Sequence, residues 1–170
     1  MNDFINISTL GPNGTDSERA AKYFAQIRRL PPYDLKLSSS FEKALQDVRE
    51  GGAHFGIVPA AYNDLLGLHY RFRDLLIDEL FLLPTKEMVL ARRSGTEVIR
   101  CVALHPSTDS FAPEGVEKLY IPSKPLCIEA VIRGDADACI GSRDVADKYG
   151  LEVVESYGEI PMSWEVFRRG

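Results

Sequence analysis

Two short segments of the sequence place hydrogen-bond donors where a helix should begin. The first, GPNGTDS at residues 11–17, follows an apolar stretch, and the second is Ser38-Ser39-Ser40. Unpaired backbone N–H groups at a helix start attract anions. The alternative is that each segment is an ordinary cap whose donors are satisfied by its own side chains. The first interpretation predicts a carboxylate or phosphate site that contains Asn13, Gly14, Thr15, Ser17, Ser39 and Ser40.

Several other side chains could complete such a site. His105 directly follows a predicted strand, and Trp164 could either stack on a ring or anchor the C-terminal segment in the core. His54 and His69 have no companions at metal-ligand spacing, and we interpret them as structural or exposed. The sequence has no P-loop and no nucleophile elbow. We therefore expect no metal or other cofactor, and add to the candidate binding residues Tyr62, Asn63, Ser123, Lys124 and Trp164.

Composition narrows the class of protein. The chain has 170 residues, of which 45% are hydrophobic and 26% charged, enough for one core or two small lobes. The net charge is −5 without a Lys/Arg-rich run, so nucleic acid and anionic membranes are not expected partners. The sequence shows no signal peptide and no membrane-spanning run. Three isolated cysteines argue against a disulfide framework and favour a cytoplasmic location.

The first half of the sequence alternates between strand and helix patterns. Helices should begin at two capping boxes, Thr15-x-x-Glu18 and Ser39-x-x-Glu42. This alternation predicts a parallel sheet with ligands at the carboxyl ends of its strands. The strands predicted for this half are Ile5–Leu10, Tyr33–Leu37 and Phe55–Pro59.

A second α/β unit is predicted after crossover strands within residues 75–93. We expect one lobe at residues 1–78, to which residues 161–170 return, and another at residues 79–160. The apolar C-terminal segment should pack back across the lobes. The elements predicted for the second lobe are strands Val98–Leu104, Leu119–Ile121, Ala138–Gly141 and Leu151–Val154, with helices at Leu126–Arg133 and from Ser142 to Gly150.

Four segments carry a family resemblance: LGPNGTDSERAAKYF, SSFEKALQDVREGGAHFGIVPA, LHPST and ADACIGSRDVADKYGL. In order and spacing they resemble the catalytic domains of prephenate dehydratases. The resemblance implies two similar α/β lobes of the type II periplasmic-binding-protein kind, with the active site in the interlobe cleft. It also implies prephenate, a dianion, as the small-molecule substrate, and a homodimer. We expect no ACT regulatory domain.

Departures from the family's motifs favour a different outcome of the reaction. Dehydratases carry Thr-Arg-Phe where this chain has Glu165-Val166-Phe167, and VPAAYNDLLG replaces their Pro-Ile-Glu-Asn-Ser segment. The family's later Ser-Thr is here Ser123-Lys124. These changes resemble the prephenate decarboxylases of secondary metabolism, such as the bacilysin-pathway enzyme, and so imply a role in antibiotic biosynthesis.

Dehydration and decarboxylation of prephenate require different catalytic groups from the protein. A dehydratase assists the departure of the ring hydroxyl, whereas a decarboxylase that keeps the hydroxyl must deliver a proton to a ring carbon. Near a dianion, Glu165 either points away or is kept protonated and acts as an acid. We predict non-aromatising decarboxylation of prephenate to dihydro-4-hydroxyphenylpyruvate, with Glu165 and His105 as catalytic residues. The alternatives are a dehydratase that forms phenylpyruvate and a non-catalytic sensor that binds a carboxylate.

Overall fold

The computed structural model describes residues 4–170, which fold as two compact units. The first unit comprises the chain up to Pro84 together with Pro161–Gly170, and the second comprises Thr85–Ile160. Residues 1–3, which the predicted first lobe included, lie outside the described residues. Each unit is built on its own five-stranded sheet. The predicted α/β class is confirmed.

The sheet of the first unit has the strand order β2-β1-β3-β10-β4. Strands β1 (Ile5–Leu10), β2 (Tyr33–Ser38) and β3 (Phe55–Pro59) are parallel, in close agreement with the prediction. Strand β10 (Ser163–Arg169) runs antiparallel between β3 and β4 (Leu75–Leu82). The apolar C-terminal segment is therefore a central strand of the first unit, where both of its neighbours satisfy its backbone.

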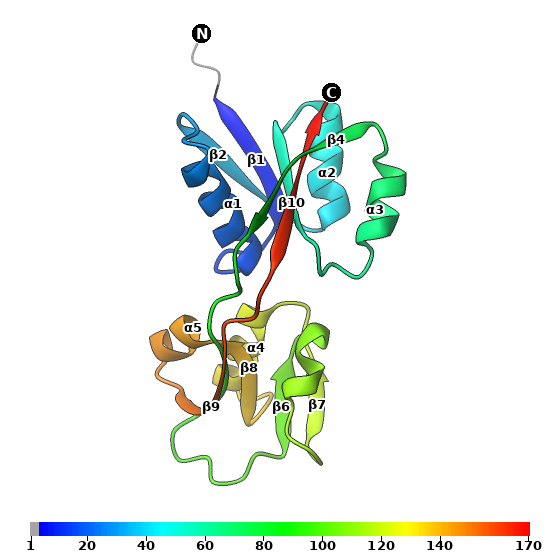
Figure 1. The fold of residues 1–170 in the computed structure, drawn as a ribbon. Coiled ribbons are helices and arrows are strands. Elements are labelled where there is room, and N and C mark those ends of the chain that lie inside the picture. The colour runs from blue at the N-terminus through cyan, green and yellow to red at the C-terminus, as the bar shows by residue number, and fades with distance from the viewer. Residues whose placement is uncertain (1–3) are drawn as a thin grey trace. The chain divides into compact units, whose positions relative to one another are not determined.

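Helices cover both faces of this sheet (Figure 1). Helix α1 (Asp16–Ile27) packs Ala20, Ala21 and Phe24 against Trp164 and Val166 of β10. Helices α2 (Phe41–Glu50) and α3 (Leu65–Arg71) cover the other face, in a cluster that includes Phe167. Because side chains alternate along a strand, β10 sends Trp164 toward α1 and Phe167 toward α2 and α3.

The helix starts agree only partly with the prediction. The predicted cap at Thr15 is confirmed, since Thr15 Oγ1 accepts a hydrogen bond from the Glu18 N–H at 3.3 Å. The Glu18 carboxylate completes the helix start by accepting from the Gly14 N–H, one residue before the predicted partner. The box at Ser39 is wrong: the cap of α2 is Ser40, whose hydroxyl oxygen accepts from the Lys43 N–H at 3.1 Å. Helix α3 is not among the elements predicted from the sequence.

The second unit has the strand order β7-β6-β8-β5-β9. Strand β6 is parallel to both β7 and β8, whereas β5 is antiparallel to β8 and β9. Its elements are β5 (Met88–Arg92), β6 (Cys101–Leu104), the 3-10 helix η1 (Pro106–Phe111), β7 (Glu117–Tyr120), α4 (Lys124–Arg133), β8 (Ala138–Ser142), α5 (Arg143–Lys148) and β9 (Glu152–Gly158).

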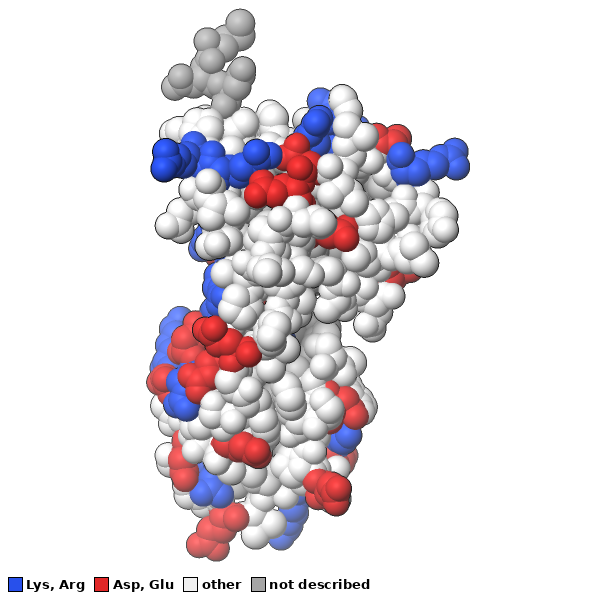
Figure 2. Space-filling view, in the orientation of Figure 1, with Lys and Arg blue, Asp and Glu red and all other residues white. Residues whose placement is uncertain are grey.

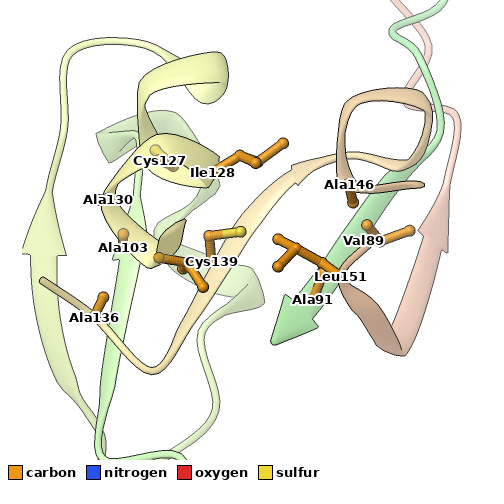
Figure 3. Close-up of a cluster of buried hydrophobic side chains, with 11 residues drawn as sticks. Val89, Ala91, Ala103, Cys127, Ile128, Ala130, Ala136, Cys139, Ala146 and Leu151 are labelled. Atoms are coloured by element: carbon orange, nitrogen blue, oxygen red, sulfur yellow. The ribbon is translucent and has the colours of Figure 1, made fainter. Parts of the chain in front are cut away.

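Small residues let α4 approach the sheet of the second unit closely. Ala103, Cys127, Ala130 and Cys139 are fully buried in the cluster shown in Figure 3. A Cβ added to Gly141 would lie 2.8 Å from the Ile128 side chain, so a larger residue at this position of β8 would force that side chain to shift. Close contact between α4 and the sheet is therefore part of how this core is packed.

The surface carries charges of both signs. On the face drawn in Figure 2, acidic and basic side chains are intermixed. Strand β4 is an edge strand, and four of its apolar side chains are exposed: Leu76, Ile77, Leu80 and Leu82. Within residues 4–170, no helix is long and apolar enough to cross a bilayer.

Candidate active site

The candidate residues of the first unit gather at one edge of its sheet. Because β1, β2 and β3 are parallel, the segments that follow them begin at the same edge, and Leu10 lies beside Ser38 in the register. The Gly11 N–H donates to the Ser38 carbonyl at 2.9 Å and joins the first two segments. The predicted residues on these segments are Asn13, Gly14, Thr15, Ser17, Ser39, Ser40, Tyr62 and Asn63.

At the start of α1, the protein's own side chains use several of the predicted donors. The Gly14 N–H donates to Glu18 Oε2 at 2.5 Å, and Lys22 contacts the other carboxylate oxygen at 2.5 Å. The Thr15 hydroxyl donates to the Pro12 carbonyl at 3.0 Å. An internal carboxylate therefore occupies part of the predicted anion site, as in the ordinary-cap alternative.

The start of α2 holds a second internal carboxylate. Tyr62 donates its phenolic hydrogen to Glu42 Oε1 at 3.1 Å, and Arg71 approaches the same oxygen at 3.3 Å. Burial raises the pKa of Glu42, but hydrogen bonds from its own backbone, Ser40 and Tyr62 outweigh this and lower the pKa overall. Burial, followed by the bond to Glu42, raises the pKa of Tyr62. Tyr62 is therefore a neutral phenol, and its hydroxyl hydrogen already takes part in the hydrogen bond to Glu42.

The side chains of Asn13, Ser39 and Asn63 are exposed at this edge, whereas Ser17 is buried. Asparagine offers amide donors and serine a hydroxyl donor, all without charge. Among the predicted residues of this edge, these three are therefore the side chains most open to a ligand.

Glu165 is the third residue of β10 and lies between Val58, near the carboxyl end of β3, and Leu80 of β4. Strand alternation turns its side chain toward the face covered by α2 and α3. His69 of α3 places Nε2 2.9 Å from Glu165 Oε2. This oxygen is buried and accepts no well-aligned hydrogen bond from the residues that the structure describes. The separation is within the range of a hydrogen bond, so His69 is the neighbour of this buried oxygen on α3.

Trp164 occupies a different environment from Glu165, its neighbour in the chain. Its side chain is 2% exposed, and the indole N–H donates to the Leu83 carbonyl at 3.0 Å. The ring stacks on Phe81 with centroids 6.4 Å apart and an interplanar angle of 12°. This is the placement expected of the core anchor, one of the two interpretations considered for Trp164.

In the second unit, His105, Ser123 and Lys124 follow the parallel strands β6 and β7 at their carboxyl ends. His105 Nδ1 accepts from the Ser107 N–H at 3.2 Å. Burial, and then the nearby charge of Lys124, lower the pKa of His105, so its imidazole is neutral at neutral pH. The Ser123 hydroxyl is buried and has no hydrogen-bond partner within residues 4–170.

From the sequence we interpret His69 as structural or exposed, and its contact with Glu165 was not predicted because the helix that carries His69 was missed. The spacing of Leu65, Leu68 and Phe72 is helical, and these residues pack toward α2 and β10. Asp64 at the cap position was a further signal. In the part of the chain that the structure describes, no group of three or more His, Cys, Asp or Glu side chains is placed to hold a metal ion.

The fold belongs to the class of proteins with two α/β units of the periplasmic-binding-protein kind. The periplasmic VFT2 domain of Bordetella pertussis BvgS superimposes with a TM-score of 0.60 at 14% identity, over 98% of this chain and 80% of that domain. Prephenate dehydratase from Arthrobacter aurescens, solved in complex with L-Phe, gives a TM-score of 0.71 at 20% identity. That match covers 98% of this chain but 61% of the dehydratase, and at these identities both comparisons establish the fold alone.

Sequence comparison assigns the family. The family model described as prephenate dehydratase matches residues 7–159, and the chain belongs to this family. A protein from Bacillus subtilis named prephenate decarboxylase is 31% identical over 183 residues, which cover 100% of this chain and 89% of the relative. The resemblance inferred from the sequence motifs is confirmed.

Proposed function

We propose that the protein is a prephenate decarboxylase that retains the ring hydroxyl of its substrate. The observation that carries this proposal is the environment of Glu165, a carboxyl group at the ligand-binding edge of the first sheet, beside apolar Val58 and Leu80. Val166, the next residue, is fully buried in the core under α1. No hydroxyl or guanidinium therefore extends from these two positions to assist a departing oxygen.

Uncharged groups of the first unit are proposed to bind one carboxylate of prephenate. Asn13, Ser39 and Asn63 are exposed at the carboxyl ends of the parallel strands. Their donors supplement the backbone N–H groups at the helix starts, as anion binding by an acidic protein requires. From the second unit we assign His105 as a neutral hydrogen-bonding group and Ser123 and Lys124 as further substrate contacts.

The reaction then proceeds without electrons from outside the substrate. The bond between the ring and its carboxylate breaks, and the electron pair moves through the ring diene as CO2 leaves. Glu165 in its protonated form gives its proton to a ring carbon, and the hydroxyl stays in place. The decarboxylases to which the chain is similar support this outcome over dehydration.

One assay separates the possible functions. Purified protein is incubated with prephenate, and products are followed by ultraviolet absorbance and mass. A non-aromatic product lighter by one CO2 is expected. Aromatic phenylpyruvate would instead identify a dehydratase, and unchanged substrate with measurable binding would identify a sensor.

A single substitution tests the role of Glu165. Glu165→Gln keeps the size of the side chain but removes the acidic proton, so kcat should fall on the order of 100-fold. Glu50→Gln, at the exposed end of α2, is the matched control and should retain full activity. Wild-type turnover by Glu165→Gln would remove Glu165 from the mechanism.

The cellular setting is also part of the proposal. We assign the protein to secondary metabolism and antibiotic biosynthesis. We also assign it to the cytoplasm, because its cysteines are unpaired. A homodimer is supported by the exposed apolar side chains of edge strand β4. Light scattering of the purified protein tests this assembly, and a monomeric mass would contradict it.

A further inference from the structure

His69 connects the buried oxygen of Glu165 to solvent. The side chain of Glu165 is 14% exposed, whereas that of His69 is 32% exposed. Nε2 of His69 lies 2.9 Å from Oε2, the oxygen that has no hydrogen-bond partner among the described residues. The imidazole also packs on Phe167, with ring centroids 5.3 Å apart, and this contact fixes the side of β10 on which it lies.

Neighbouring charges do not compete for this contact. Arg71, two residues further along α3, pairs with Asp64 and Glu42. The buried face of α3 consists of apolar residues, so it offers Glu165 no other polar group. His69 is therefore the titratable side chain of α3 that lies within hydrogen-bond distance of Glu165.

We propose that His69 supplies Glu165 with the proton that each decarboxylation consumes. This inference rests on the proposed function, in which Glu165 protonates the ring. As Oε1–H gives its proton to the ring carbon, imidazolium Nε2–H gives its proton to Oε2. CO2 has left, Glu165 remains a neutral carboxylic acid, and His69 becomes a neutral imidazole. Water then protonates the partly exposed imidazole again, and a half-turn about the Cγ–Cδ bond of Glu165 returns the protonated oxygen to the side of the ring.

The burial of Oε2 is the physical reason for such a relay. After a proton transfer without His69, Glu165 would be a carboxylate with one oxygen shielded from water and the other facing the bound molecule. Replacing its proton would then have to wait for the product to leave. An imidazole is suited to the task because its ordinary pKa lies near neutral pH and both of its nitrogens can carry a proton.

Two substitutions at His69 test the relay. His69→Gln retains a side-chain amide near Glu165 but cannot carry a proton, so kcat should fall about 10- to 100-fold with KM within about 2-fold of the wild-type value. His69→Ala should show a similar loss, and added imidazole should restore part of kcat. His54→Gln is the matched control. His54 is an exposed histidine of the same unit that accepts from the Asn6 N–H, and its substitution should leave turnover unchanged.

The outcomes separate this inference from the proposed function. If wild-type protein releases CO2 but folded His69→Gln has wild-type kcat, the relay is wrong and the decarboxylase assignment stands. A loss of kcat in His69→Ala that imidazole does not restore, accompanied by a lower melting temperature, would make His69 structural and also overturn the relay. If wild-type protein itself releases no CO2 from prephenate, the proposed function fails and the relay fails with it.

Discussion

Glu18 Oε2 accepts a hydrogen bond from the Gly14 N–H at 2.5 Å, at the helix start where the sequence predicts an anion site. Lys22 contacts the other oxygen of the same carboxylate at 2.5 Å. A substrate carboxylate that approaches this helix start therefore meets a negative charge that is already in place. The internal carboxylate stabilises the free protein through the helix dipole and opposes binding of a dianion.

Glu18→Gln should strengthen prephenate binding. The amide oxygen of glutamine can still accept from the Gly14 N–H, but the negative charge is removed and Lys22 loses its partner. Removing a like charge worth roughly 1 kcal/mol should lower KM about 5-fold with little change in kcat. Steady-state kinetics measure this, with Glu50→Gln as the control. An unchanged or higher KM would show that no substrate carboxylate binds at this helix start.

Thr15→Val should affect both stability and affinity. The hydroxyl accepts from the Glu18 N–H and donates to the Pro12 carbonyl, and valine can do neither. Loss of the cap should cost about 1 kcal/mol of unfolding free energy. Because the loop would no longer be held, KM should also rise. Denaturant unfolding and kinetics measure the two effects, and Thr15→Ser, which keeps the hydroxyl, is the control. A stability loss with unaltered KM would confine Thr15 to capping.

Trp164→Phe should lower stability rather than affinity. Phenylalanine retains an aromatic ring beside Phe81 but leaves the Leu83 carbonyl without its donor. The expected cost is about 1–3 kcal/mol, seen as a lower melting temperature, with KM unchanged. The opposite pattern, a raised KM at an unaltered melting temperature, would mean that the indole contacts the substrate.

Local patterns in the sequence were enough to predict most of the first sheet and its helices. Alternating strands and helices and the Thr15-x-x-Glu18 box depend on residues close together in the chain. The start of α2 was misplaced because Ser38, Ser39 and Ser40 are equivalent as caps in sequence terms. The structure selects Ser40, since a helix that begins at Phe41 places that ring in the core at 4% exposure.

The contacts that matter most for the proposed chemistry are not local. His69 meets Glu165 because β10 enters the sheet beside β3, and no pattern around either residue specifies that pairing. Helix α3 has seven residues, too few for a strong periodic signal. In the same way, the sequence identified Glu18 as a capping residue. It did not indicate that the Glu18 carboxylate would accept a hydrogen bond from the Gly14 N–H, which was predicted to bind the ligand.

His105 should titrate below the ordinary range of histidine. Burial disfavours its charged form, and the ammonium group of Lys124 disfavours it further, so both effects lower the pKa. NMR titration of the imidazole should show this directly. In Lys124→Gln the pKa of His105 should move upward toward the ordinary value, because one of the two causes has been removed. A pKa that did not change in this variant would show that Lys124 does not act on the ring.

The lowered pKa of His105 makes the unfolding free energy of the protein depend on pH. In the unfolded chain, His105 binds a proton near pH 6.5, whereas in the folded protein it does so only at lower pH. Because the unfolded state then binds more protons, the contribution of this group to stability is present above about pH 6.5 and is lost as the pH falls toward the folded value. Wild-type protein should therefore lose more unfolding free energy between pH 7 and about pH 5 than His105→Gln, measured by denaturant titration at each pH. Parallel curves for the two proteins would contradict the assignment of a buried, neutral imidazole at the end of β6.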